Sequence, residues 1–121
     1  MNKRSLNYKV LLVFAPVLIL VGILGFVIPS ESALTSGAAP YNIFHLIFGA
    51  FGLILLLSKN EGYIRGFNIG FGLIDLYQAF ASFLDLFPEK HFQWTRVDDI
   101  LHILIGAALV SIGLFAAKSR S

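Results

Sequence analysis

The chain has 121 residues, of which 57% are hydrophobic and only 13% are charged. Soluble domains carry about 25% charged residues, so this composition excludes a soluble globular protein. The absence of cysteine excludes disulfides, iron–sulfur clusters, Cys-ligated zinc and a cysteine nucleophile, and a net charge of only +2 is too small for the basic patch that binds nucleic acid. We therefore expect a small integral membrane protein whose surroundings are the lipid bilayer, with no nucleic-acid partner.

Four apolar runs follow one another, and each is long enough to cross a hydrocarbon core of about 30 Å as a helix. They cover Val10–Ile28, Tyr41–Ser58, Gly66–Phe87 and Ile100–Ala117. An open sheet is excluded in lipid because its edge groups would lack hydrogen-bond partners, and the first run is too long for the core of a signal peptide. The sequence predicts an all-α, integral membrane four-helix bundle that forms a single domain over residues 1–121.

Positive charges predict the orientation of this bundle. By the positive-inside rule, both termini and the 59–65 turn should be cytoplasmic, and the connections at 29–40 and 88–99 should face outward. We expect the second connection, with Trp94, to lie against the lipid headgroups. The outward side has Lys90 and Arg96, and the cytoplasmic side has Lys3, Arg4, Lys9, Lys59, Arg65, Lys118 and Arg120.

The two halves of the chain contain the same motif, [Asn/Asp]-x-x-His-x-x-x-Gly. It begins at Asn42 in the second run and at Asp99 in the fourth, and it places His45 and His102 at matching positions. Both halves enter the membrane from the same side, which predicts two parallel-repeat helical hairpins related by a pseudo-twofold axis along the membrane normal. We expect Asn42 and Asp99 to be helix N-caps, because such side chains accept hydrogen bonds from free N–H groups.

These motifs resemble those of a bacterial family of small four-helix membrane proteins that is known only as a domain of unknown function. The resemblance extends over nearly the whole chain and includes Gly22-x-x-Gly25-Phe26, Asn42-x-x-His45-x-x-x-Gly49 and Asp99-x-Leu101-His102-x-x-x-Gly106. It implies four transmembrane helices and a multi-pass protein of a bacterial cytoplasmic or internal, energy-converting membrane. It implies no activity, and the polar third run departs from the pattern.

Glycines share helix faces with both histidines: Gly49 and Gly52 with His45, and Gly106 and Gly113 with His102. Small residues let helices approach closely, so both histidines should point into helix contacts. They are expected either to hydrogen-bond across such a contact or to bind a tetrapyrrole, a haem or a chlorophyll-type pigment, as axial ligands. A zinc site is less expected. The glycines expected to pack helices are Gly22, Gly25, Gly49, Gly52, Gly66, Gly70, Gly106 and Gly113.

The third run has one polar stripe, which consists of Asn68, Asp75, Gln78, Ser82 and Asp85. Asp75 should lie about 15 Å below Asp85, near the middle of the membrane. An ionisable residue at that depth points to function, although a protonated Asp75 that is hydrogen-bonded to Gln78 or to a backbone carbonyl is the structural alternative. We expect Asp85 to pair with His45 or His102, since a carboxylate fixes the tautomer of an imidazole.

Three functions remain open from the sequence. The first is a non-catalytic accessory subunit that packs against other integral membrane subunits, because no complete catalytic set is present and no cofactor is required. The second is tetrapyrrole binding through His45 and His102. The third is a small transporter or proton-conducting protein that uses the polar stripe.

Overall fold

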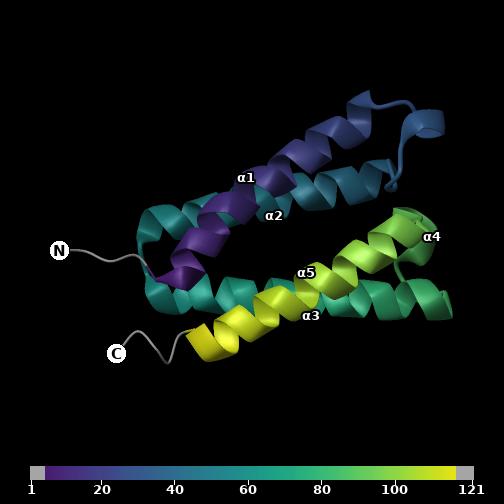
Figure 1. Ribbon diagram of the computed structural model, residues 1–121. Helices are drawn as coiled ribbons and strands as arrows, with labels where there is room; N and C mark the ends of the chain where they lie inside the picture. Colours follow the sequence, from purple (N-terminus) through teal and green to yellow (C-terminus); the bar gives the residue numbers. More distant parts are fainter. Residues whose placement is uncertain (1–4, 117–121) are drawn as a thin grey trace.

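The computed structural model describes residues 5–116, which form four long helices and two short helical elements (Figure 1). Four of these helices are long and apolar enough to cross a membrane, and residues 5–116 contain no strand. The predicted all-α four-helix architecture is therefore confirmed. The elements are α1 (Leu6–Val27), the 3-10 helix η1 (Ser30–Ser32), α2 (Ala39–Ser58), α3 (Glu61–Leu84), α4 (Glu89–Phe92) and α5 (Arg96–Phe115).

The helices α3 and α5 begin earlier than the apolar runs predicted. α3 follows Asn60, whose side chain accepts a hydrogen bond from the Tyr63 N–H at 3.0 Å. α5 follows Thr95, which forms a capping box with Asp98. The predicted helices begin too late because each apolar run is counted only from its first uncharged residue. Polar residues are nevertheless favourable in the first turn, since they satisfy the free N–H groups of a helix end.

Asn42 and Asp99 are not N-caps, contrary to the prediction. Each is the fourth residue of its helix, and the residues that precede the two helices are Ala38 and Thr95. The Asn42 amide donates a hydrogen bond to the Gly37 carbonyl at 2.9 Å and so holds the end of the preceding connection. The repeated motif marks a helix face rather than a helix start.

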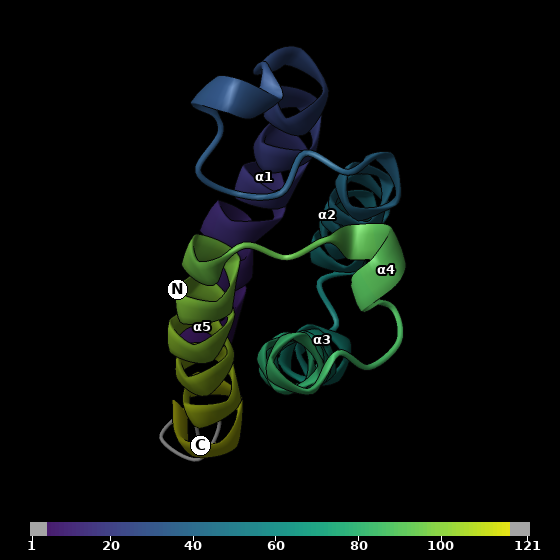
Figure 2. The ribbon, with the colours of Figure 1, turned by 90° about the vertical axis from the view of Figure 1, so that its right-hand side faces the viewer.

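The four long helices form two antiparallel hairpins, α1 with α2 and α3 with α5 (Figures 1 and 2). Glycines lie where the helices of each hairpin meet. A Cβ on Gly49 would lie 2.9 Å from the Ala15 carbonyl oxygen, and a Cβ on Gly106 would lie 2.8 Å from the Gly72 carbonyl oxygen. The backbones are therefore in direct contact. Gly22 meets the Asn42 backbone in the same way. Three other glycines make room for side chains of the facing helix: Gly25 for Asn42, Gly52 for Leu11 and Ala15, and Gly113 for Ile69.

Residues that are 57 positions apart occupy equivalent places in the two hairpins, as Gly49 and Gly106 do. Phe14 and Phe71 are another such pair, and they touch each other edge to face with ring centroids 5.5 Å apart. The pseudo-twofold axis passes between them and runs along the bundle. The parallel repeat predicted from the sequence is thus a structural repeat. We call the end with the 28–38 and 85–95 connections the loop end, and the opposite end the terminal end.

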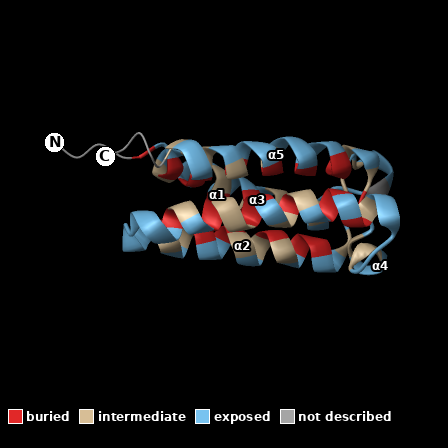
Figure 3. Cartoon of the chain, turned by 90° about the horizontal axis from the view of Figure 1, so that it is seen from below, coloured by how far each residue is buried: buried red, intermediate tan, exposed pale blue. Residues whose placement is uncertain are grey.

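The outer surface of the bundle is apolar. Buried residues line the inward faces of the helices, while large hydrophobic side chains such as Val13, Leu57 and Phe83 are exposed on the outward faces (Figure 3). A soluble protein of this size does not expose so continuous an apolar surface, whereas a lipid-facing surface requires it. The protein is therefore a multi-pass membrane protein.

We predict that Gly106→Leu destabilises the protein by about 3 kcal/mol, because the new side chain collides with the backbone of α3 at Gly72. Ala107→Leu is the control. It also introduces a leucine, but at an exposed position, and it should leave the free energy of unfolding unchanged. The measurement is the free energy of unfolding in detergent micelles. Equal stabilities of the two variants would contradict the backbone contact.

Candidate functional site

A cavity of about 140 Å³ lies between the two hairpins, and residues of α1, α2, α3 and α5 all line it. We call it the axial cavity, because it includes Phe14 and Phe71 at the pseudo-twofold axis. Most of its wall is apolar. Its polar residues are the half-buried Thr35 and five that are at least nine-tenths buried: Tyr41, His45, Asp75, Asp98 and His102.

Asp98 is the acceptor that joins the two hairpins. Its Oδ2 accepts hydrogen bonds from the Ser36 N–H at 2.8 Å and from the Thr95 N–H at 2.9 Å, so it holds both loop-end connections. Its Oδ1 accepts one from the Tyr41 hydroxyl of α2 at 3.1 Å. A buried carboxylate with this many donors is satisfied without a counter-cation.

The Tyr41 hydroxyl also lies 2.7 Å from Nε2 of His102. A hydroxyl has one hydrogen, so its donation to Asp98 requires that His102 donate from Nε2. The arrangement thus fixes the tautomer of His102 through a tyrosine rather than directly through a carboxylate. Nδ1 of His102 is buried without a partner, and so is Nδ1 of His45.

Asp85 does not take part in this cluster, contrary to the prediction that it pairs with His45 or His102. It lies beyond the last turn of α3 in the left-handed conformation (φ 61°) and is exposed, because the helix ends at Leu84. Partial burial raises the pKa of the Glu89 carboxyl above its ordinary value, and the charge of Asp85 adds to this effect. Asp98 occupies the place expected for Asp85.

The inner part of the predicted stripe faces the core of the bundle. Asn68 donates to the backbone carbonyl and the side-chain oxygen of Asn7 on α1, at 3.1 and 3.0 Å. Gln78 donates to Oδ1 of Asp75 at 3.1 Å and accepts from the Trp94 indole N–H at 2.9 Å. Trp94 is therefore buried inside the loop end, not placed against the headgroups as predicted. Ser82 is half-buried.

A layer of phenylalanines separates Asp75 from Asn68. Phe71 lies at its centre, and its ring centroid is 5.2–5.8 Å from those of Phe14, Phe44, Phe48 and Phe67. This layer closes the axial cavity toward the terminal end, so the polar stripe is not one continuous path across the bundle.

The geometry does not fit a tetrapyrrole held by both histidines. Nε2 of His102 is engaged by Tyr41, whose ring lies 4.3 Å from the His45 ring and 6.0 Å from the His102 ring, centroid to centroid. A cavity of 140 Å³ is also close to the roughly 150 Å³ that holds one benzene molecule, which is far too small for a macrocycle. Within residues 5–116, no group of three or more His, Asp or Glu side chains could hold a metal ion.

Comparison with protein-family models, with curated proteins and with solved structures gives no match. The resemblance to a bacterial membrane family therefore stays a prediction. The function of this protein is therefore inferred from the geometry of the chain alone.

Three residues of the site, Tyr41, Asp98 and Trp94, were not among the predicted site residues. Tyr41 and Asp98 are 57 positions apart and directly precede the two copies of the repeated motif. An alignment extended by one residue would have placed them at equivalent positions near the axis. Nothing in the sequence indicates that Trp94 turns inward to reach Gln78.

We predict that Asp98→Ala destabilises the protein, by about 1–3 kcal/mol for each buried donor that loses its acceptor. Asp85→Asn removes the same charge at an exposed position, keeps a residue that tolerates the left-handed conformation, and should have little effect. Unfolding of both variants in detergent micelles tests this. If Asp98→Ala is as stable as Asp85→Asn, the carboxylate does not hold the hairpins together.

We also predict that the protein, gently extracted from its native membrane, has no tetrapyrrole absorption band that depends on its histidines. The reason is the small cavity and the occupied Nε2 of His102. Absorption spectra of the oxidised and reduced protein are compared with those of the His45→Ala, His102→Ala double variant. A band that is present in the wild type and lost in the double variant would overturn this interpretation.

Proposed function

We propose that this membrane protein is a non-catalytic subunit of a larger membrane assembly, and that the groove between α2 and α3 receives a transmembrane helix of a partner subunit. The observation that supports the proposal is a row of glycines on α3 that the bundle itself does not use. Gly62, Gly66 and Gly70 are spaced by four and share one face of the helix.

The row faces away from the bundle. A Cβ on Gly66 or on Gly70 would meet no atom within 4 Å, although both were predicted to pack inside the bundle. Every other glycine within the long helices, apart from Gly62 in the same row, meets a neighbouring helix of this chain at 3.1 Å or less. Glycine thus marks a helix contact elsewhere in the protein, and the contact at this row has no partner in one chain.

Large side chains flank the row and form a groove of about 380 Å³. Its walls come from α2 and α3 and include Phe48, Phe51, Leu55, Tyr63, Phe67 and Ile74. The groove is almost entirely apolar, which suits an occupant that lies in the hydrocarbon core.

A helix explains these glycines better than a lipid chain does. Each glycine in a helix interior costs about 1 kcal/mol relative to alanine, and a lipid chain packs on leucine as well as on glycine. Only a second backbone gains from the close approach that glycine permits. The small-xxx-small spacing at Gly62, Gly66 and Gly70 is typical of such crossings.

The axial cavity favours neither catalysis nor conduction. Asp98 already accepts several hydrogen bonds, the Tyr41 hydroxyl is held between Asp98 and His102, and the phenylalanine layer around Phe71 interrupts the polar stripe. The helix surface is therefore the feature through which a protein with such short connections can act.

We predict that the Gly66→Leu, Gly70→Leu double variant loses its partner. Leucines at these positions fill the groove and hold the partner helix away, so retention of the partner should fall at least about tenfold. Native mass spectrometry of the particle extracted from the native membrane gives its mass and stoichiometry. The wild-type particle should be larger than one 13.3 kDa chain and contain a second polypeptide.

Ala50→Leu is the matched control, because it adds similar bulk to an exposed position of α2 outside the groove. It should retain the partner fully. A wild-type particle of one chain, a particle made only of copies of this chain, or equal retention in the double variant would each contradict the proposal.

A further inference from the structure

The axial cavity contains two polar atoms without partners that are open to it. Among the hydrogen bonds of residues 5–116, none involves Nε2 of His45 or the second carboxylate oxygen of Asp75. Both atoms therefore keep some accessible surface, unlike the fully buried Nδ1 atoms of His45 and His102. Both residues line the cavity. Of the other polar residues of the wall, Tyr41, Asp98 and His102 already bond to one another, and Thr35 lies on the side of the first connection.

A hydroxyl is the group that matches these two atoms. An imidazole nitrogen either donates or accepts, according to its tautomer, and a carboxyl oxygen does so according to its protonation. A hydroxyl both donates and accepts, so it pairs with either form. An anion is disfavoured, since the wall contains Asp75 and Asp98 and no Lys or Arg.

The size and shape of the cavity favour one aromatic ring. Its volume of about 140 Å³ is close to that of a cavity that holds one benzene molecule. The rings of Phe14, Tyr41 and Phe71 line it, and planar groups pack well against aromatic side chains.

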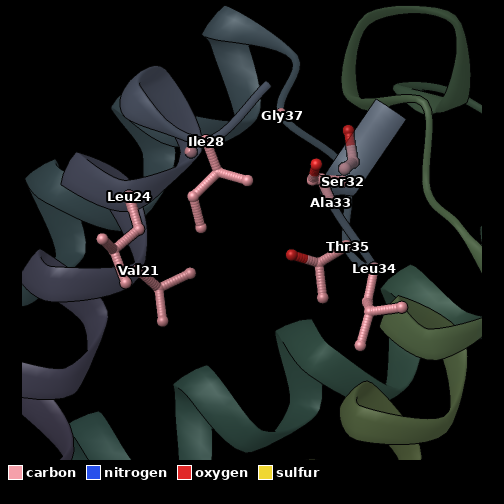
Figure 4. Close-up of a pocket in the computed structure, with 10 residues that line it drawn as sticks. Val21, Leu24, Ile28, Ser32, Ala33, Leu34, Thr35 and Gly37 are labelled. Carbon is pink, nitrogen blue, oxygen red and sulfur yellow. The ribbon is translucent and has the colours of Figure 1, made fainter. Parts of the chain in front are cut away.

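A second pocket borders this cavity on the side of α1. This pocket, of about 290 Å³, lies between the end of α1 and the first connection, and it shares Val21 and Thr35 with the axial cavity. Figure 4 shows Val21, Leu24 and Ile28 on one side of this pocket and Thr35 on the other. Leu24 and Ile28 are exposed on the lipid-facing surface. A ligand with an apolar tail can therefore place its ring in the axial cavity and its tail in this pocket.

From these observations we infer that the axial cavity binds the hydroxylated aromatic head group of a membrane-soluble molecule, of the hydroquinone kind. Its hydroxyls bond to Asp75 and His45, its ring packs against Phe14 and Phe71, and any tail leaves past Val21. This site shares Phe71 with the α2–α3 groove, but none of its proposed hydrogen bonds involves a residue of the groove, so ligand binding does not require the proposed partner helix.

Trp94 is a built-in reporter of the site, because it is the single tryptophan of the chain and is linked through Gln78 to Asp75. The experiment is a titration of the ¹⁵N-labelled full chain in detergent micelles with unsubstituted hydroquinone, observed at the Trp94 indole resonance. p-Xylene is the matched ligand, since it has nearly the same size but a methyl group in place of each hydroxyl. We expect a saturable shift with the hydroquinone and none with p-xylene at the same concentrations.

Asp75→Leu and His45→Phe should each weaken binding at least about tenfold, because each removes one hydrogen-bonding partner of the ligand. Asp85→Asn, at an exposed position of the same protein, should bind as the wild type does. The inference is overturned if the hydroquinone causes no saturable shift, if p-xylene shifts the resonance equally, or if both cavity variants titrate like the wild type. The comparison of the two ligands uses only the wild type and so holds even if a variant does not fold.

Discussion

The carboxylate of Asp98 is the constraint on which the loop end of this protein depends. A buried carboxylate needs donors, and here they come from Ser36 and Tyr41 of one hairpin and from Thr95 of the other. The two connections also bond directly to each other, from the Ser36 hydroxyl to the Phe92 carbonyl and from the Thr95 hydroxyl to the Leu34 carbonyl, and Asp98 links this contact to α2. Tyr41 extends the same network to His102, so the position of the carboxylate also decides the environment of the axial cavity.

Different forces act within the hairpins and between them. Inside each hairpin, glycines such as Gly49 and Gly106 let the backbones touch, which is the packing that works in lipid, where no hydrophobic effect drives helices together. Between the hairpins, contact depends on the phenylalanine layer and on a few polar bonds, including that of Asn68 with Asn7. Because large side chains and polar groups hold the hairpins apart, space remains between them for the axial cavity.

The two faces of helix α3 contact different surroundings. Its inward face presents Asp75 and Gln78 to the axial cavity and to Trp94, and its outward face presents Gly66 and Gly70 to the membrane. Helix α2 also borders both sites, through His45 in the axial cavity and Phe48 in the groove. The proposed partner helix and the proposed ring ligand would therefore contact the same two helices.

The sequence by itself determined the membrane class, the four helices and the parallel repeat, because apolar length and a repeated motif are local properties of the chain. It also singled out Asp75 as an ionisable residue of the third span, and the structure shows that this residue is buried within the bundle. Only the tertiary structure decided that Asp98 replaces Asp85 beside the histidines and that Gly66 and Gly70 face outward. Helical spacing tells which residues share a face, but which face turns inward depends on how the two hairpins pack against each other.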